Sequence, residues 1–424
     1  MKFKKIMALV LVGVMALSMA ACKKEDKGSG VKKVSLVMWG AEEDQEMLAE
    51  MVAKFVELHK DEVKLTVSIG VESEQSVKDT ILGDVAGAAD IYSFANDQIN
   101  ELVQAGALVE VTDAFGKAEV TARNVAGSIE AATVNGKLYA FPRTADNGFF
   151  LFYNKEFLSE EDVASWETML EKAASLGKKV SMEMNSGWYT FGFYEAVGLS
   201  CGLGENGKDT VIDWNSKTNA VTGVQVTQKI LDICKHPGFI ATEDAEFVTG
   251  IAEWEDEDQT TSSGAGQIIA GVNGTWNAAK AQLAWGDNYA ATKLPTFDID
   301  GEDYQMYSVA GYKMIGVNPN CKNAGWALKL AEFITNEENQ VKSFEERQTG
   351  PSNIKAAESD AVKANVAIAA FAKQQQWAAV QIVGTNFWTA TESFGQVLQN
   401  GNPDNIDLQK LLDDMVAAAT AHIE

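Results

Sequence analysis

Strand-like and helix-like patterns of apolar residues alternate along the chain. Residues 34–39 form a continuous apolar run of strand length, and residues 42–60 carry apolar side chains three and four positions apart, as on one face of a helix. Residues 63–69 then alternate between apolar and polar side chains, which is typical of a strand. A strand, a helix and a second strand in this order make a βαβ unit, and such units build parallel sheets. The pattern therefore predicts an α/β protein.

The alternation continues over the rest of the chain. Further strands are expected at 90–94, 138–141, 149–153 and 179–184, and further helices at 74–86, 98–105, 165–176, 218–234 and 276–284. The last quarter is predicted to be mostly helical, at 324–335, 356–376, 386–400 and 405–422. Asn135-Gly136 predicts a hairpin turn, because both residues accept a positive φ.

The N-terminus carries the pattern of an export signal. Three lysines among the first five residues precede an apolar run at 6–17, which is shorter than the roughly 20 residues that a bilayer span needs. The run ends in Leu-Ser-Met-Ala-Ala-Cys, which resembles a bacterial lipobox, whose cysteine is diacylated. We predict a lipoprotein signal peptide at 1–21, lipidation of Cys22, and a flexible tether at 22–33. Plain secretion with an incidental thiol at Cys22 is the alternative.

Composition and charge exclude several classes of function. The 424 residues suggest two or three domains, and a formal net charge of −25 argues against a nucleic-acid partner. The three histidines are far apart and the four cysteines include no CxxC pair, so no metal site and no cofactor are predicted. Cys201 and Cys234 could form a disulfide, and buried free thiols are equally compatible with the sequence.

Motifs for enzyme chemistry are missing from the sequence. No GxSxG, GxGxxG or GxxxxGK[ST] stands between a strand and a helix. Carboxylates are abundant, but abundance alone does not mark the catalytic pair of a glycosidase, so no catalytic residue is assigned. The acidic segments 243–258 and 298–303 are interpreted as a solvated face and a hairpin tip.

The tryptophans point to a carbohydrate ligand. Among ten tryptophans, Trp188, Trp276 and Trp388 stand beside polar residues in loop-like settings, whereas Trp166 and Trp326 lie in helical stripes and are predicted to be core residues. A sugar presents apolar C–H faces, which match aromatic rings, and hydroxyl edges, which match amides and carboxylates. The pattern favours a neutral, polyhydroxylated ligand over an anionic one. Packing in the core or at an interface is the alternative for each of these three tryptophans.

A family resemblance rests on short motifs in a fixed order. They are Gly83-Asp84, Ala89-Asp90-Ile91, Phe94-Ala95-Asn96-Asp97, Ala105-Gly106-Ala107-Leu108, the stretch 135–142 (NGKLYAFP), Tyr153-Asn154-Lys155, the stretch 271–276 (GVNGTW), Leu294-Pro295-Thr296 and Phe387-Trp388. With these motifs the chain resembles the family 1 extracellular solute-binding proteins of ATP-binding-cassette (ABC) importers, in the style of the maltose/maltodextrin-binding group.

The resemblance implies a type II periplasmic-binding-protein fold. Each of two lobes would hold a mixed, mostly parallel sheet flanked by helices, with a hinge of crossing strands between the lobes and the ligand in the interlobe cleft. Lobe one would comprise 34–144 plus 309–355, and lobe two 145–308 plus 356–424. The run 149–153 would cross after the hinge.

The resemblance also implies the ligand residues. Carried over position by position, they are Glu43, Phe94, Asp97, Asn147, Trp188, Trp276 and Trp388. Phe94 stands at an aromatic stacking position, and Asp97 stands at a carboxylate that bonds to sugar hydroxyls. Asn147 and Glu392 replace a glutamate and an arginine of the maltose-type proteins, which implies a preference for a sugar other than maltose.

The implied partners are an oligosaccharide and the transmembrane subunits of an ABC permease. The protein would be an exported monomer, held to the outer face of the cell membrane only through its N-terminal lipid. Three alternatives remain open at this point: the same fold with another neutral solute, a secreted glycosidase, and a surface adhesin.

Overall fold

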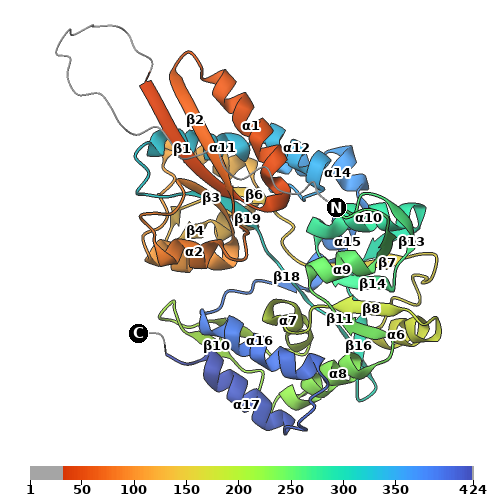
Figure 1. Cartoon of the computed structure of the whole chain (residues 1–424). Helices are drawn as coiled ribbons and strands as arrows, with labels where there is room; N and C mark the ends of the chain where they lie inside the picture. Colours follow the sequence, from red (N-terminus) through yellow and green to blue (C-terminus); the bar gives the residue numbers. More distant parts are fainter. Residues whose placement is uncertain (1–31, 423–424) are drawn as a thin grey trace, which may run out of the picture.

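Two five-stranded sheets organise residues 32–422, the part of the chain that the computed structural model describes. One sheet has the strand order β2-β1-β3-β19-β6, and the other has the order β11-β8-β14-β7-β15. The two sheets lie in separate bodies joined by extended segments (Figure 1). We call the body around the first sheet lobe one and the body around the second sheet lobe two. The predicted signal peptide, Cys22 and residues 22–31 of the predicted tether lie outside the described residues.

The sheet of lobe one is mixed. Its strands are β1 (Lys32–Gly40), β2 (Val63–Val71), β3 (Ile91–Ala95), β6 (Phe141–Thr144) and β19 (Lys313–Val317). Strands β1, β2 and β3 are parallel, and β19 runs antiparallel to β3 and β6. Its helices are α1 (Gln45–Leu58), α2 (Val77–Gly83), α3 (Ile99–Gln104), α4 (Lys117–Arg123), α5 (Ala126–Ala131), α11 (Ala324–Ile334), α12 (Glu337–Arg347) and α13 (Ile354–Ala357). Strand β1 begins at Lys32, so the last two residues of the predicted tether belong to the sheet instead.

The sheet of lobe two repeats this arrangement. Its strands are β7 (Phe150–Asn154), β8 (Lys179–Met182), β11 (Phe239–Ala241), β14 (Ile268–Asn273) and β15 (Tyr289–Thr292). Strands β8, β11 and β14 are parallel, and β7 runs antiparallel to β14 and β15. Its helices include α6 (Trp166–Ser175), α7 (Gly187–Glu195), α8 (Gly223–Lys235), α9 (Asp244–Gly250), α10 (Ala278–Trp285), α16 (Asn386–Gln399) and α17 (Leu408–Ala419). The prediction of an α/β protein with two mixed sheets is confirmed, although each sheet has two parallel and two antiparallel strand pairs and is therefore not mostly parallel.

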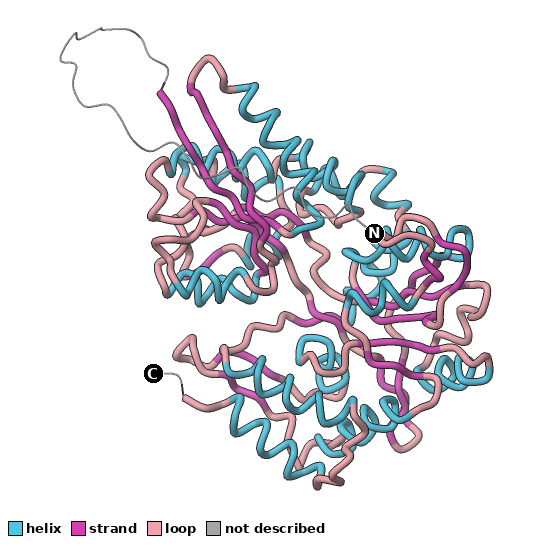
Figure 2. The backbone as a smooth tube through the Cα atoms, viewed as in Figure 1, coloured by secondary structure: helices cyan, strands magenta, loops and turns pink. Residues whose placement is uncertain are grey.

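Extended segments connect the lobes side by side (Figure 2). Residues 145–149 leave lobe one after β6, and β18 (Ser308–Val309), paired with β20 (Ala378–Ala379), leads back to it. The backbone N–H of Asn147 donates to the carbonyl of Gly311 at 3.2 Å, and that of Ala145 donates to the carbonyl of Gly350 at 2.9 Å. Three passes of the chain are therefore tied together between the lobes, where a hinge is expected.

Helix caps and turn residues explain several element boundaries. Ser165 accepts a hydrogen bond from the backbone N–H of Thr168 at the start of α6, and Thr222 forms a capping box that delays α8 relative to the predicted helix. Asn135-Gly136 turns between β4 (Thr133–Val134) and β5 (Lys137–Leu138) with positive φ at both residues, as predicted.

Two parts of the helical prediction were wrong. The predicted helix 356–376 is broken, because the side chain of Asn365 caps a new helix, α15 (Val366–Gln374), by accepting from the N–H of Ile368 at 3.0 Å. Helix α12 was not predicted, since its sequence is strongly polar and only one face is buried. The predicted hairpin tip at 298–303 is confirmed by the pairing of β16 (Thr296–Ile299) with β17 (Glu302–Gln305).

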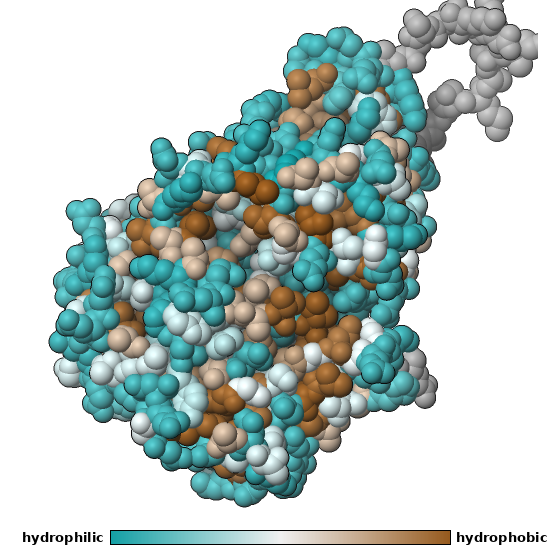
Figure 3. Space-filling model, turned by 180° about the vertical axis from the view of Figure 1, so that it is seen from behind, coloured by the Kyte–Doolittle hydropathy of each residue, from teal (hydrophilic) through white to brown (hydrophobic). Residues whose placement is uncertain are grey.

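The surface carries no broad apolar band on the face seen in Figure 3, where apolar residues form separate patches within a mostly hydrophilic surface. Among residues 32–422, no helix combines the length and the apolar character needed to cross a bilayer.

The cysteines among residues 32–422, which are Cys201, Cys234 and Cys321, are free thiols rather than disulfide partners. Burial raises the pKa of Cys201 and Cys234 to about 12, so these thiols are unreactive near neutral pH.

Candidate functional site

Polar side chains gather at one edge of the sheet in lobe one. Glu43 and Asp44 follow β1, Glu74 follows β2, Asp97 follows β3, and Lys313 begins β19. Because β19 runs against its neighbours, its first residue lies at the same edge as the last residues of β1, β2 and β3. The chain leaves and re-enters lobe one at this edge, so the edge faces lobe two. Ligands of open α/β sheets bind at such carboxyl ends of strands.

Polar and aromatic side chains also gather at one edge of the sheet in lobe two. Glu183 follows β8, Asp244 follows β11, Trp276 follows β14, and Asn147 precedes β7, which runs the other way. Trp188 stands near the start of α7, directly after the loop that follows β8. The topology therefore brings the predicted residues Asn147, Trp188 and Trp276 to the edge of lobe two that faces lobe one.

Trp188 and Trp276 form an aromatic pair. Their ring centroids are 5.9 Å apart at an interplanar angle of 50°, and Trp188 also packs at 4.9 Å on Phe149. Both indoles remain partly exposed. Trp276 folds back over Gly274, where an added Cβ would lie 2.0 Å from the indole ring. Glycine is therefore required at position 274 for the ring to adopt this orientation.

Trp388 lies on the first turn of α16. This end of α16 faces lobe one, because Thr385 Oγ1 donates to Glu101 Oε2 in α3 at 2.7 Å. Glu392 lies one turn after Trp388 on the same side of the helix, since residues four apart share a helical face. Trp388 packs against Phe387 at 5.1 Å. Thr385, Trp388 and Glu392 follow one another at intervals of three and four residues. Trp388 and Glu392 therefore lie on the same side of α16 as Thr385, which contacts lobe one.

The two lobes touch at the rim in this structure. Besides the bond between Thr385 and Glu101, Gln104 Nε2 donates to the carbonyl of Gly207 at 2.8 Å. Both contacts join α3 in lobe one to loops of lobe two. In Figure 1 the part of lobe two around β10 and α16 lies below the part of lobe one around α2 and β4. The described arrangement is therefore one in which the lobes are drawn together.

A buried ionic cluster underlies the edge of lobe one. Arg143 Nη2 lies 2.7 Å from Asp44 Oδ2, and Arg347 Nε lies 3.2 Å from Asp44 Oδ1. Glu74 Oε1 lies 3.8 Å from Arg143 Nη1. Burial alone would raise the pKa of Asp44, but the charges of Arg143, Lys313 and Arg347 outweigh burial and lower this pKa. Two of the chain's three arginines thus hold carboxylates in place instead of binding a free anion.

Two carboxyl groups near the cleft have raised pKa values. Burial raises the pKa of Asp97 to about 6, although its own backbone N–H and the charge of Lys78 oppose this shift. Burial, with the negative charges of Asp244, Glu243 and Glu392, raises the pKa of Glu183 to about 7. Such groups gain from a hydroxyl or amine ligand that would restore the hydrogen bonds lost with water.

Phe94 does not occupy the position that the family resemblance implied. Its side chain is fully buried in the core of lobe one, where it packs at 6.3 Å on Tyr92. It offers no ring surface to a ligand, because β3 is the central strand of the sheet and both of its faces are covered. Glu43 is exposed on the 3-10 helix η1 (Glu42–Asp44), with Arg347 Nη2 at 3.9 Å from its Oε1.

Sequence reasoning missed several residues at this site. Asp44, Glu74, Arg143, Glu183 and Lys313 all lie at the sheet edges, yet none was predicted as a functional residue. The available signal was positional: each stands within a few residues of a strand end that faces the cleft. Arg143 was visible only as one of three arginines.

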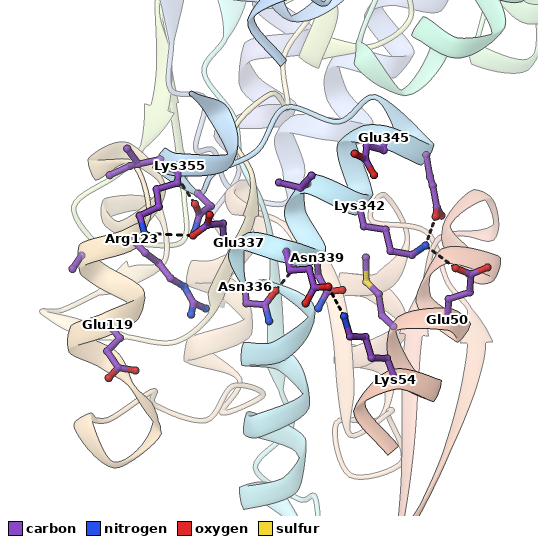
Figure 4. Close-up of a pocket in the computed structure, with 17 residues that line it drawn as sticks. Glu50, Lys54, Glu119, Arg123, Asn336, Glu337, Asn339, Lys342, Glu345 and Lys355 are labelled. Atoms are coloured by element: carbon purple, nitrogen blue, oxygen red, sulfur yellow. Dashed lines mark hydrogen bonds and ion pairs between the residues drawn. The ribbon is translucent and has the colours of Figure 1, made fainter. Parts of the chain in front are cut away.

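A groove of about 1230 Å³ lies elsewhere, on lobe one (Figure 4). Side chains of α1, α4, α12 and α13 line it, and none of the predicted ligand residues does. Several of its charged groups pair with each other, as Lys342 does with Glu50 at 2.6 Å and Lys355 with Glu337 at 3.7 Å. We therefore do not assign the ligand to this groove.

Metal-binding clusters are absent from residues 32–422: no three His, Cys, Asp or Glu side chains in this range converge so that they could hold an ion. The chemistry that the interlobe site offers is consequently that of indole faces, carboxylates, amides and one ammonium group.

Comparisons with known proteins match nearly the whole chain. The family model for bacterial extracellular solute-binding proteins matches residues 50–370. A galactooligosaccharide-binding protein of Bacillus subtilis (strain 168) is 27% identical over 438 residues, covering 99% of this chain and 98% of the relative.

Solved structures show the same fold. One solved with acarbose has a TM-score of 0.80 and 30% identity, and the match covers 92% of this chain and 99% of the other. The ligand-free maltodextrin-binding protein MalE1 from L. casei BL23 has a TM-score of 0.72 and 23% identity, with 92% and 100% covered. These similarities confirm the predicted two-lobed type II fold.

Proposed function

Because this chain belongs to the bacterial extracellular solute-binding proteins, we propose that it captures an oligosaccharide between its lobes and delivers it to the permease of an ABC importer. The family membership and the relative that binds galactooligosaccharides support this proposal. The main structural support for this function is the pair of partly exposed indoles of Trp188 and Trp276. Their ring centroids are 5.9 Å apart, at the edge of lobe two opposite the carboxylates of lobe one. Flat apolar faces rimmed by hydrogen-bond acceptors suit a sugar ring.

Binding draws on both lobes. A sugar ring would stack on Trp276 and Trp188, with Trp388 extending the platform along α16. Asp97 and Glu43 of lobe one would then accept hydrogen bonds from its hydroxyl groups. Because the ligand contacts both lobes only when they are together, it shifts the hinge equilibrium toward the closed form. The permease would recognise that closed form.

The mutation of two tryptophans tests this proposal. Trp276→Ala combined with Trp388→Ala should weaken oligosaccharide binding at least tenfold in calorimetry, because stacked aromatic surface is lost. Trp254→Ala removes a partly exposed indole of lobe two outside the site and serves as the control. An unchanged affinity in the double variant, with its melting temperature preserved, would rule the site out.

The sugar itself is best found by a thermal-shift screen. Malto-oligosaccharides and galacto-oligosaccharides should be compared, since proteins similar to this chain bind one or the other. A ligand that binds only the native state raises the melting temperature with its saturation. Recovery of the intact sugar by chromatography after incubation would support binding without hydrolysis, whereas cleavage products would support a glycosidase.

We further propose that Cys22 carries the lipid that holds an exported monomer at the outer face of the membrane. The basic start, the short apolar run and the lipobox-like end of the first 22 residues support this proposal. Replacement of Cys22 by alanine should release the protein into the medium or periplasm, as followed by cell fractionation. Retention of the variant in the membrane fraction would contradict lipid anchoring.

A further inference from the structure

A lysine from lobe one reaches the aromatic platform of lobe two. Lys313 is the first residue of β19 and pairs with Ala95 and Thr144 on the neighbouring strands. Its Nζ lies 5.7 Å from the centroid of the Trp276 ring, which belongs to the other lobe. The side chain of Lys313 is about 19% exposed. It is thus a largely buried cation positioned over a ring on which we place the sugar.

The ammonium group of Lys313 has unused hydrogen-bonding capacity. It carries three N–H donors, and its nearest carboxylate oxygen, Glu74 Oε2, is 3.7 Å away, beyond hydrogen-bonding distance. Within residues 32–422, the groups described near this ammonium are the carboxylate of Glu74 and the indole face of Trp276. A desolvated cation without acceptors is unfavourable, so the site gains when a ligand supplies oxygen atoms.

Lys313 remains charged under binding conditions. Burial would lower its pKa, but the carboxylates of Glu74, Asp44 and Asp146 outweigh burial and raise it. The buried ionic cluster therefore keeps a positive charge at this edge, although the chain as a whole is strongly acidic. Hydrogen bonds from a charged donor are stronger than those between neutral groups.

We propose that Lys313 is a specificity-determining residue of the oligosaccharide cleft: its ammonium group donates hydrogen bonds to hydroxyl or ring oxygens of the sugar stacked on Trp276. This inference rests on the proposed function. One sugar unit would then contact both lobes. Its face stacks on Trp276 of lobe two, and the oxygen atoms at its edge accept hydrogen bonds from Lys313 of lobe one. A unit that lacks an oxygen at that edge, or that carries a cationic amine there, binds less well.

The test compares Lys313 with a second lysine in the same geometry. Lys280 Nζ lies 5.7 Å from the Trp254 ring, outside the cleft, so Lys280→Met matches the loss of a cation–π contact without touching the site. Calorimetry with maltotriose and with galactotriose at pH 7.5 identifies the better probe for the wild type. With that probe, Lys313→Met should bind at least tenfold more weakly, and Lys313→Arg should recover most of the affinity. Lys280→Met should bind within twofold of the wild type.

A chemical footprint gives a readout without mutation. Reductive methylation followed by mass spectrometry should show that the bound sugar protects Lys313 but not Lys280. This measurement decides the question if Lys313→Met fails to fold.

The outcomes separate the inference from the proposed function. If Lys313→Met binds within twofold of the wild type while Trp276→Ala loses affinity, the cleft stands and the role of Lys313 is overturned. Equal methylation of Lys313 with and without a sugar that binds also overturns it. If the wild type binds no sugar in the panel, the proposed function fails, and the role of Lys313 fails with it.

Discussion

Thr385 at the start of α16 donates a hydrogen bond of 2.7 Å from its Oγ1 to Oε2 of Glu101, which lies on α3 in the other lobe. Glu101 also forms an ion pair with Lys78 of its own lobe, whose Nζ lies 3.2 Å from Oε1 of Glu101. The bond joins the lobes at the rim of the cleft, beside the contact of Gln104 with the carbonyl of Gly207. These contacts exist only when the lobes are together, so they contribute to closure independently of the ligand.

Loss of the rim bond should favour the open form. Thr385→Val keeps the shape of the side chain and removes the hydroxyl donor to Glu101. A hydrogen bond of this kind contributes about 1 kcal/mol, which corresponds to about a fivefold weaker apparent affinity for the sugar. Calorimetry should show this loss, and small-angle scattering should show a larger radius of gyration without ligand. Thr389→Val, at an exposed position on the same helix, is the control. If both variants match the wild type in both measurements, the rim bond has no role in closure.

The buried pair of Asp44 and Arg143 should matter for stability. Arg143 is 3% exposed and Asp44 is 6% exposed. Asp44→Asn removes the nearer of the two carboxylates that pair with the buried guanidinium and leaves Glu74 at 3.8 Å, which costs up to roughly 3–5 kcal/mol of unfolding free energy. Denaturant unfolding measures this loss. Asp414→Asn breaks the exposed pair of Asp414 with Lys410 and should cost under about 1 kcal/mol.

The same pair predicts the acid limit of stability. Arg143 and Lys313 hold the pKa of Asp44 below its ordinary value, so the unfolded state binds the proton first as the pH falls. The stabilisation from Asp44 is therefore complete above about pH 5 and is lost progressively as the pH falls below it. Asp44→Asn should flatten the acid part of the stability profile. A profile that keeps the wild-type slope would show that other groups dominate acid unfolding.

The sequence predicted the fold more fully than the site, for a physical reason. The spacing of apolar residues along one strand or helix shows which of its faces is buried. The alternation at 63–69 therefore predicted β2 directly. Asp44, Arg143 and Lys313 are brought together by β1, β6 and β19, which are distant in sequence, and no local period reports such a meeting. Phe94 shows the converse error, since a motif match placed it at a ligand while its strand lies in the middle of the sheet.

Sugar binding should weaken on acidification through Asp97. Burial raises the pKa of this carboxyl to about 6, so it is mostly ionised at pH 7.5 and mostly protonated at pH 5. The ionised form accepts hydrogen bonds from sugar hydroxyls more strongly than the protonated form. Calorimetry between pH 5 and pH 8 should show an affinity that rises through pH 6. Asp97→Asn should bind more weakly at pH 7.5, with a smaller dependence on pH. If this variant keeps the wild-type pH dependence, the titrating group is another residue.

Glu183 should destabilise the native state at alkaline pH. Burial and the nearby carboxylates of Asp244, Glu243 and Glu392 raise its pKa to about 7. Between pH 4.5 and pH 7 the native state therefore holds a proton that the unfolded state has released. Because the native state binds more protons in this range, the unfolding free energy falls as the pH rises through it.

Removal of the charge should reverse this penalty. Glu183→Gln keeps the size of the side chain, and we expect it to raise the unfolding free energy at pH 8 by about 3 kcal/mol, with the gain shrinking toward pH 4.5. Denaturant unfolding at pH 4.5, 6 and 8 measures the effect, and Glu161→Gln, at an exposed position, should change little at any of them. If Glu183→Gln is less stable than the wild type at pH 8, the carboxylate of Glu183 is satisfied in the native state, and the carboxylates of Asp244, Glu243 and Glu392 do not destabilise it.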